Sequence, residues 1–328
     1  MPSVVCENLT KVFTGRRPVR ALDHFSLTVE EGEIFGLLGP NGSGKTTFVK
    51  CCLNIIFPTS GKLRVLGRRP GNLKTSLHVG YLPENPNFLD HLSGRAFLYY
   101  HAELARVPLA NRHRRVEEVL ERVRLDPTAA RRRLRTYSKG MLQRIGLAQA
   151  LLGKPTLIFL DEPQTGLDPI GRSEVKVIMR EAVHEGSTVL FSSHVLGDVE
   201  DVADRVAIID KGRVKRVASL DALTLRTNHV FVRLQPRSLP AAPVNDEKLP
   251  DIVARALDSL GAGSVAYTDG VLECTLNDEK MIPRLVQSLT VSGVDIFEVT
   301  QERMSLEKTF LKEFGPATPE PAKAPESV

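Results

Sequence analysis

Short apolar runs alternate with helical periods from residue 1 to about residue 217. The runs are rich in β-branched and aromatic residues, and in the segments between them apolar positions recur every three or four residues. This alternation predicts an α/β fold, a sheet with crossover helices that is largely parallel in its core. The predicted strands are "LTVE" at 27–30, "IFGLLG" at 34–39, "KLRVLG" at 62–67, "TLIFLD" at 156–161, "STVLFSS" at 187–193 and "RVAIID" at 205–210.

The pattern changes between Pro86 and Leu152, where strand signals stop and helical segments follow one another. The apolar spacing predicts helices over 98–104, 116–123 and 141–152. We interpret residues 86–152 as a helical subdomain inserted into an α/β body that extends over residues 1–220.

After Leu220 the chain has a pattern of its own. The order βαββαβ predicts a small ferredoxin-like α+β domain over 225–314. The Pro- and Ala-rich residues 315–328 are typical of a disordered tail. The predicted elements are a strand at 229–234, a Pro-rich break at 234–250, a helix at 249–260, two strands around an Asp269-Gly270 turn at 264–276, a helix at 281–293 and a strand at 294–299.

The composition, 25% charged and 42% hydrophobic residues in a chain of 328, is typical of a soluble globular protein. No apolar run approaches the roughly 18 residues that span a bilayer, and the N-terminus lacks the pattern of a signal peptide. We therefore expect a cytoplasmic protein. The four cysteines fit neither a zinc site nor a disulfide framework, so we expect them to be buried as small hydrophobic residues.

The formal net charge is +5, and basic residues cluster at 112–115 and 131–135. A solvated face is the usual explanation of such clusters, and a surface for a partner or for lipid head groups is the alternative. The chain has five Tyr and no Trp, and no stacking motif is interleaved with the basic residues. Nucleic acid is therefore not an expected partner.

The sequence "GPNGSGKT" at 39–46 fits the phosphate-loop pattern G-x-x-x-x-G-K-[ST] between an apolar strand and a helical segment. Backbone N–H groups of such a loop cradle phosphates, Lys45 can reach the β- and γ-phosphates, and the Thr46 hydroxyl can hold Mg²⁺. A plain glycine-rich turn is disfavoured by the flanking strand and helix. The predicted nucleotide-binding residues here are Gly39, Pro40, Asn41, Gly42, Ser43, Gly44, Lys45, Thr46 and Thr47.

Two carboxylates follow one another at the end of the strand "TLIFLD". Beside a phosphate loop, Asp161 suits the magnesium shell and Glu162 suits the base that orients and deprotonates water. The alternative is the N-cap of a helix. His194 ends another apolar strand, where it can hydrogen-bond a γ-phosphate or serve a purely structural role.

Ser138-Lys139-Gly140 opens the helical segment that ends near Leu152. Ser at an N-cap followed by Gly presents bare N–H groups and the positive end of the helix dipole to an anion. Since the chain already has a phosphate loop, the phosphate for this second site needs another source.

Together these motifs resemble those of the ATP-binding-cassette (ABC) ATPases over residues 1 to about 217. The segment "YSKGM" resembles the signature loop of that family, with Ser138 and Gly140 at its most characteristic positions, and His194 matches the switch histidine. "TGLDP" at 165–169, with Gly166, Leu167 and Asp168, matches the loop that crosses to the partner subunit. Phe13 stands where the family stacks an aromatic ring on adenine, although an isolated Phe is usually a core residue.

The resemblance implies ATP and Mg²⁺ as cofactors and a head-to-tail dimer of two chains. In such dimers the signature loop of one chain caps the γ-phosphate held by the phosphate loop of the other. The resemblance thus supplies the missing source: the phosphate belongs to the neighbouring chain.

Three positions depart from the common pattern of the family. Glu84 stands where most cassettes have Gln, and Lys139 and Met141 stand where the signature usually has Gly and Gln. A carboxylate can still ligate Mg²⁺, so the predicted metal ligands are Thr46, Glu84 and Asp161. Similar substitutions, and an ending similar to "SLEKTFLKEFG" at 305–315, occur in the exporter branch of multidrug, antibiotic and gliding-type cassettes. A plain amphipathic helix is the alternative for that ending.

The leading hypothesis is therefore the ATP-hydrolysing subunit of an ABC exporter, peripheral on the cytoplasmic face of the membrane. Its expected partners are separate membrane permease subunits and a second copy of itself or a paralogous ATPase. One alternative is a soluble mechanical ABC ATPase, although the chain has neither a long heptad insertion nor a second cassette. Another is a nucleotide-gated protein that scarcely hydrolyses ATP, an idea favoured by Glu84 and opposed by Glu162 and His194.

Overall fold

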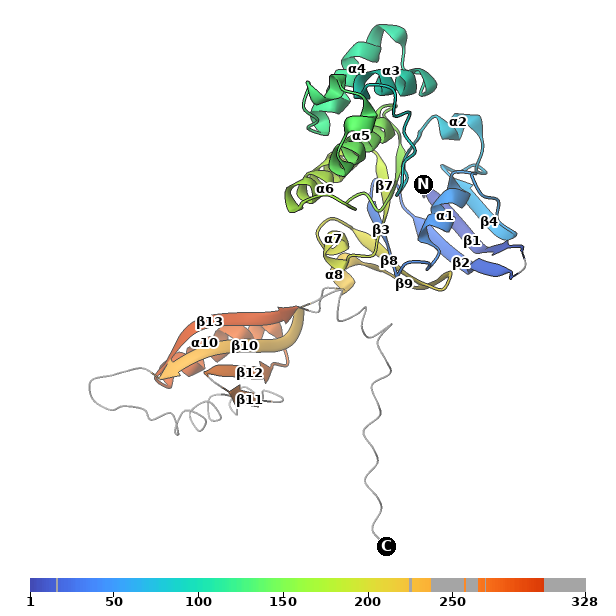
Figure 1. Cartoon of the computed structure of the whole chain (residues 1–328). Coiled ribbons are helices and arrows are strands. Elements are labelled where there is room, and N and C mark those ends of the chain that lie inside the picture. The colour runs from blue at the N-terminus through green and yellow to red at the C-terminus, as the bar shows by residue number, and fades with distance from the viewer. Residues whose placement is uncertain (16, 224–225, 237–256, 258–264, 269, 304–328) are drawn as a thin grey trace. The chain divides into compact units, whose positions relative to one another are not determined.

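The computed structural model describes residues 1–15, 17–223, 226–236, 257, 265–268 and 270–303. The chain divides into two compact units, Met1–Leu220 and Asp221–Val328 (Figure 1). The first unit contains the phosphate loop, the acidic pair, the signature loop and His194. None of the helices in the described part of the chain is both long and apolar enough to cross a membrane.

A six-stranded sheet forms the centre of the first unit, with the order β5-β6-β7-β3-β8-β9. All neighbouring strands in it are parallel except β8 and β9. Every residue of the central strands β3, β6 and β7 is buried, as expected for parallel strands covered on both faces. The α/β prediction is confirmed. The strands are β3 (Ile34–Leu38), β5 (Val79–Leu82), β6 (Leu157–Asp161), β7 (Thr188–Ser193), β8 (Arg205–Asp210) and β9 (Arg213–Ser219).

A separate antiparallel sheet, β2-β1-β4, consists of β1 (Val4–Phe13), β2 (Val19–Val29) and β4 (Ser60–Val65). The sequence prediction placed 27–30 and 62–67 in one largely parallel sheet, and that assignment was wrong. The connection between β1 and β2 is far shorter than the dozen residues that a parallel crossover needs, so these strands pair antiparallel. In β4 only Leu63 and Val65 are buried, the alternation of a strand with one open face.

The helical subdomain contains α3 (Gly94–Leu104), α4 (Leu109–Arg122) and α5 (Lys139–Leu151), with two short 3₁₀ turns before α5. All three predicted helices are present, but α3 and α4 begin earlier than predicted. Ser93 caps α3 by accepting the Ala96 N–H at 3.2 Å. The first turns of α4 are polar and show no apolar period. The other helices of this unit are α1 (Lys45–Cys52), α2 (Leu73–Ser76), α6 (Pro169–His184), α7 (Leu196–Glu200) and the start of α8 (Leu220–Leu223).

The main hydrophobic core lies between the two sheets and α1. Phe25 of β2 and Phe48 of α1 are fully buried in it, with ring centroids 4.7 Å apart. All four cysteines are buried, as predicted: Cys6, Cys51 and Cys52 in this core and Cys274 in the second unit. Burial raises the pKa of the Cys6 thiol to about 12, so this thiol stays protonated and unreactive at neutral pH.

The second unit contains the antiparallel sheet β11-β12-β10-β13 and helix α10. This strand order, with the hairpin β11–β12 at one edge, is that of a ferredoxin-like unit. β10 continues through Pro236, so the strand extends into the segment 234–250 that was predicted as a Pro-rich break. The predicted helix at 249–260 (apart from Leu257), the segment 305–315 and the tail 315–328 lie outside the described residues. The elements are β10 (Arg226–Pro236), β11 (Val265–Thr268), β12 (Val271–Thr275), α10 (Ile282–Val291) and β13 (Val294–Arg303).

Candidate functional site

The phosphate loop joins the carboxyl end of β3 to α1, which begins at Lys45. Gly44 lies at the N-cap of α1 with φ +109°, and no side chain there caps the helix. A Cβ on Gly44 would lie 2.6 Å from the Ala21 carbonyl oxygen, so a side chain is excluded both by φ and by space. The first N–H groups of α1 are therefore left for an anion.

Lys45 is buried inside its own loop. Its Nζ donates hydrogen bonds to the Gly39 carbonyl at 2.7 Å and to the Pro40 carbonyl at 3.2 Å, and it lies 3.9 Å from Glu162 Oε1. Burial lowers the pKa of Lys45, while the charges of Glu162, Asp161 and Glu84 act in the opposite direction. The ammonium group is thus held by neutral carbonyls that a phosphate can replace as partners.

Glu162 and His194 meet although they follow different strands. His194 Nδ1 lies 2.9 Å from Glu162 Oε2, whereas Glu162 Oε1 is buried with no hydrogen-bond partner among the described residues. When Glu162 is ionised, Nδ1–H is the donor, since a carboxylate only accepts. Burial raises the pKa of Glu162, and the charges of His194 and Lys45 and the hydrogen bond from His194 oppose that shift. Glu162 therefore has one oriented oxygen and one oxygen free to accept a proton.

A cavity of about 120 Å³ adjoins these two side chains. Glu162, Gln164, His194 and Asp198 line it, together with residues of β7. A water molecule occupies about 30 Å³ in the liquid. The cavity is therefore large enough for a few waters within reach of the Glu162 carboxylate.

Asp161 has two unlike carboxylate oxygens. Oδ1 accepts the Ser192 hydroxyl at 2.5 Å, and Oδ2 is buried without a hydrogen-bond partner in the described part of the chain. Among the described residues no cluster of three or more His, Cys, Asp or Glu could hold a metal ion. Mg²⁺ is usually held by one or two carboxylates together with waters and substrate phosphates. Asp161 Oδ2 and the half-buried Thr46 fit that kind of site.

The N-cap alternative for Asp161 and Glu162 is excluded because no helix begins at either residue. The next helix, α6, begins at Pro169, and its cap is Asp168, whose Oδ1 accepts the Gly171 N–H at 2.7 Å. Glu162 instead has φ +51°, an uncommon conformation for a residue with a side chain. Such backbone conformations cluster at functional sites.

The signature loop has the predicted helix start. Ser138 is the N-cap of α5 and accepts the Met141 N–H at 3.3 Å, while Ser138 and Lys139 are exposed. The Lys139 side chain covers Gly166, where a Cβ would come within 2.5 Å of it, and Gly140 faces Leu167. The signature loop thus packs directly on the loop 165–168 of its own chain.

Two polar contacts that sequence reasoning missed tie this region together. Gln143 of α5 is buried, and its Nε2 donates to the Pro163 carbonyl at 2.8 Å, next to Glu162. The Ser192 hydroxyl binds Asp161 as described. The sequence did contain a signal for these contacts, namely a polar residue within an apolar helix or strand. Such a side chain is buried there and needs a hydrogen-bond partner.

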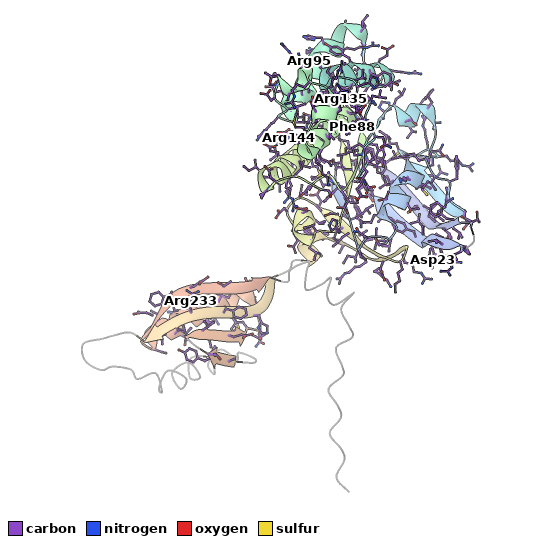
Figure 2. The ribbon with its side chains drawn as sticks, viewed as in Figure 1. Asp23, Phe88, Arg95, Arg135, Arg144 and Arg233 are labelled. Carbon is purple, nitrogen blue, oxygen red and sulfur yellow. The ribbon has the colours of Figure 1, made fainter. Side chains whose placement is uncertain are left out.

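The remaining predicted residues lie around these two groups. Phe13 ends β1 with 40% of its surface exposed, so it is not a core residue, and Lys11 Nζ lies 5.0 Å from its ring centroid. Glu84 is exposed after β5, close enough for its charge to act on Lys45. Phe88 (labelled in Figure 2), in the segment that follows Glu84, packs beside Gly146 of α5. The structure thus brings Lys45, Asp161, Glu162 and His194 together in one group and residues 138–141 and 166–168 in another.

Comparison with protein families matches residues 22–165 to the family described as ABC transporter. An uncharacterized ABC transporter ATP-binding protein of Nostoc sp. is 39% identical over 318 residues, 95% of this chain and 90% of that protein. The bacitracin transport ATP-binding protein BcrA of Bacillus licheniformis is 32% identical over 95% of this chain and 97% of its own length. A solved structure of an ATP binding subunit of an ABC transporter matches with a TM-score of 0.61 and 28% identity, covering 67% of this chain and 91% of that one.

Proposed function

The chain belongs to the ABC transporter family of ATP-binding proteins, and on that premise we propose how its residues bind and hydrolyse ATP. Membership makes it the nucleotide-binding, ATP-hydrolysing subunit of a transporter, which confirms the prediction from the motifs. The observation that carries the catalytic proposal is the arrangement of Glu162, with one oxygen bound to His194 and the other free beside Lys45.

In this proposal the phosphate loop binds the triphosphate through its backbone N–H groups and Lys45, which exchanges the Gly39 and Pro40 carbonyls for phosphate oxygens. Glu162 Oε1 accepts a proton from the attacking water. His194 keeps the carboxylate oriented through Nδ1, and its Nε2 is left to contact the γ-phosphate. Phe13 stacks on the adenine ring.

Asp161 Oδ2, the Thr46 hydroxyl and Glu84 are the groups that would hold Mg²⁺ with the phosphates. The ion, when bound, neutralises charge on the β- and γ-phosphates. The unpartnered Oδ2 supports Asp161 most directly. Glu84 adds a negative charge where Gln is common, so it should strengthen metal binding and weaken attraction for the triphosphate.

Phosphate release from ATP by the purified chain tests this function, and its pH profile tests the base. The rate should fall as the pH is lowered through the raised pKa of Glu162, because protonation removes the acceptor lone pair. Since His194 lowers that pKa, His194→Ala should move the acid limb to higher pH as well as reduce the rate. His184→Ala, at an exposed histidine that ends α6, is the control and should leave the profile unchanged. A chain that releases no phosphate at any pH would contradict the function itself.

We further propose that two chains dimerise head to tail, with Ser138, Gly140 and the first N–H groups of α5 capping the γ-phosphate of the partner. The exposure of Ser138 and Lys139 supports this, since a helix start that binds an anion is available at the surface. Residues 166–168 would cross the same interface. The proposed dimer has two nucleotide sites, each formed by the phosphate loop of one chain and the signature loop of the other. The contact of residues 166–168 with the signature loop would link these two sites.

The proposed membrane partners are separate permease subunits, and the proposed direction of transport is export. The bacitracin relative is named as a transport protein, which supports transport itself. Large apolar side chains are exposed after α1 and on α3, which supports a protein surface there. Docking on separate permeases would place the chain at the cytoplasmic face of the membrane. These side chains are Ile55, Phe57, Tyr100 and Leu104.

The second unit, proposed as an accessory domain over 225–314, should be dispensable for nucleotide binding. It has its own sheet and its own core, so truncation after Leu220 should leave ATP affinity unchanged and alter oligomerisation or transport coupling. Calorimetry and size-exclusion chromatography measure the two effects. Truncation after Asp204 is the matched control: it removes β8, the neighbour of β3, and should abolish binding. Loss of binding in the Leu220 truncation would show that the boundary is misplaced.

A further inference from the structure

Ser192 lies at the carboxyl end of β7, between the strand that leads to the phosphate loop and the strand that ends in the acidic pair. In the parallel register it is opposite Leu37 of β3 on one side and Asp161 of β6 on the other. Its side chain is completely buried. A hydroxyl at such a position has to find its partners within the protein.

The Ser192 hydroxyl contacts both acidic residues at once. It donates to Asp161 Oδ1 at 2.5 Å and accepts the Glu162 N–H at 2.9 Å. One hydroxyl can do both, because it has one donor and two acceptor lone pairs. The donated bond is in the range of charge-assisted O–H···O⁻ bonds, which are stronger than bonds between neutral groups.

Each of these bonds restrains one of the two acidic residues. With Oδ1 bound to Ser192, the orientation of the Asp161 carboxylate is restrained, and Oδ2 is its oxygen without a hydrogen-bond partner among the described residues. Glu162 directly follows the last residue of β6 and has an uncommon backbone φ of +51°. The hydrogen bond from its N–H to Ser192 supports this conformation, in which the side chain reaches His194. Ser192 therefore controls the orientation of one acid and the backbone of the next.

We propose that Ser192 is a positioning residue for ATP hydrolysis, which fixes Asp161 for the metal and Glu162 for the attacking water. The inference rests on the proposed roles of those two acids. In this proposal Ser192 acts through Asp161 and Glu162 and not by its own contact with the nucleotide. It sets the geometry of these two residues, and the same hydroxyl couples them, so that movement of one carboxylate is transmitted to the backbone of the other.

Ser192→Ala removes both hydrogen bonds and little else. Groups that orient metal ligands typically contribute 10–100-fold to metal affinity or activity. We expect kcat to fall by about 10–100-fold and the Mg²⁺ concentration for half-maximal ATP binding to rise by a comparable factor, about tenfold or more. ATP binding in EDTA, measured by calorimetry, should be unchanged. Values of kcat and Mg²⁺ dependence indistinguishable from those of the unmodified chain would overturn the proposal.

A second pair of variants keeps the test decisive if Ser192→Ala folds poorly. Ser192→Thr and Ser192→Val add nearly the same volume at a buried position, but only Thr retains a hydroxyl. The Thr variant should retain more activity and tighter Mg²⁺-dependent binding than the Val variant. Equal behaviour of the two variants would contradict a role for the hydroxyl.

The control for loss of a buried hydroxyl is Thr188→Val at the other end of β7. Thr188 is also completely buried, and its Oγ1 accepts the Gly32 N–H at 2.9 Å and bonds Ser3 Oγ at 2.8 Å. The Thr188→Val variant should have a lower melting temperature and an unchanged kcat and Mg²⁺ dependence.

If the unmodified chain shows no Mg²⁺-dependent ATP binding, the proposed function is wrong. If the unmodified chain shows such binding and Ser192→Ala changes neither kcat nor Mg²⁺ dependence, only this inference is wrong.

Discussion

Glu162→Gln should keep ATP binding and lower the rate of hydrolysis by at least about a hundredfold, since loss of a general base typically costs 10²–10⁴. The substitution keeps the size and burial of the side chain, and Gln still offers an acceptor to His194 Nδ1. What it removes is the free carboxylate oxygen beside Lys45 and the cavity. The Glu162→Gln variant should therefore bind ATP as the unmodified chain does and hydrolyse it much more slowly.

Single-turnover phosphate release and equilibrium binding of labelled ATP measure the two effects. In the proposed dimer, slow hydrolysis should also make an ATP-bound dimer accumulate, visible by size-exclusion chromatography. Glu185→Gln, an exposed acid at the end of α6, is the control for removing one negative charge and should hydrolyse normally. Turnover of Glu162→Gln close to that of the unmodified chain would assign the base to another group.

The residues of the proposed phosphate site could be brought together from the sequence because each follows an apolar strand. Gly39 follows β3, Glu162 follows β6 and His194 follows β7. Since the three strands are parallel neighbours, their carboxyl ends share one edge of the sheet. The positions of these residues after apolar strands therefore predicted that Lys45, Glu162 and His194 lie close together, although they are far apart in the sequence.

The antiparallel sheet and the role of Ser192 could not be predicted in the same way. Short apolar runs such as 27–30 and 62–67 do not specify their partner strands, and register is a property of pairs. Ser192 is one polar residue within "STVLFSS", and only the pairing with β6 reveals that it faces Asp161. The contact of Lys139 with Gly166 likewise depends on the packing of α5 against a loop that comes later in the chain.

The geometry excludes one explanation in each of two cases that the sequence left open. Asp168 caps α6, so the acidic pair is left without a capping role. Phe13 is too exposed to be a core residue, and Lys11 Nζ lies 5.0 Å from its ring centroid. In both cases the competing explanations predict different burial or hydrogen bonding of the side chain, and a sequence motif does not specify either.

The head-to-tail arrangement predicts an all-or-none result when two inactive chains are mixed. One chain carries Lys45→Ala and keeps its signature loop; the other carries Ser138→Arg and keeps its phosphate loop. If the signature acts on the partner, the mixed dimer retains one whole site, formed by the phosphate loop of the second chain and the signature loop of the first. If the signature acts within its own chain, no whole site remains.

The reciprocal mixture, a chain with both substitutions and an unmodified chain, should give the opposite result: no whole site in the head-to-tail dimer and one in the within-chain case. Mixed dimers are isolated with two affinity tags, and ATP occlusion is measured, because transport can require both sites. Ser93→Arg provides the control, since Ser93 caps α3 in the same subdomain as Ser138 caps α5. Ser93→Arg should leave ATP occlusion unchanged if Ser138→Arg acts through its contact with the nucleotide and not through loss of a helix cap.

The expected difference between the two mixtures is large. Ser138→Arg places a bulky cation at a close phosphate contact and removes a charge-assisted hydrogen bond of about 1.5–3 kcal/mol, which corresponds to more than about tenfold in occupancy. Loss of the cap itself costs about 1 kcal/mol of helix stability, and that cost is the same in both mixtures. Only the location of the intact phosphate loop relative to the intact signature loop differs between them. Occlusion by the reciprocal mixture, without occlusion by the first, would therefore place the signature loop at the nucleotide of its own chain.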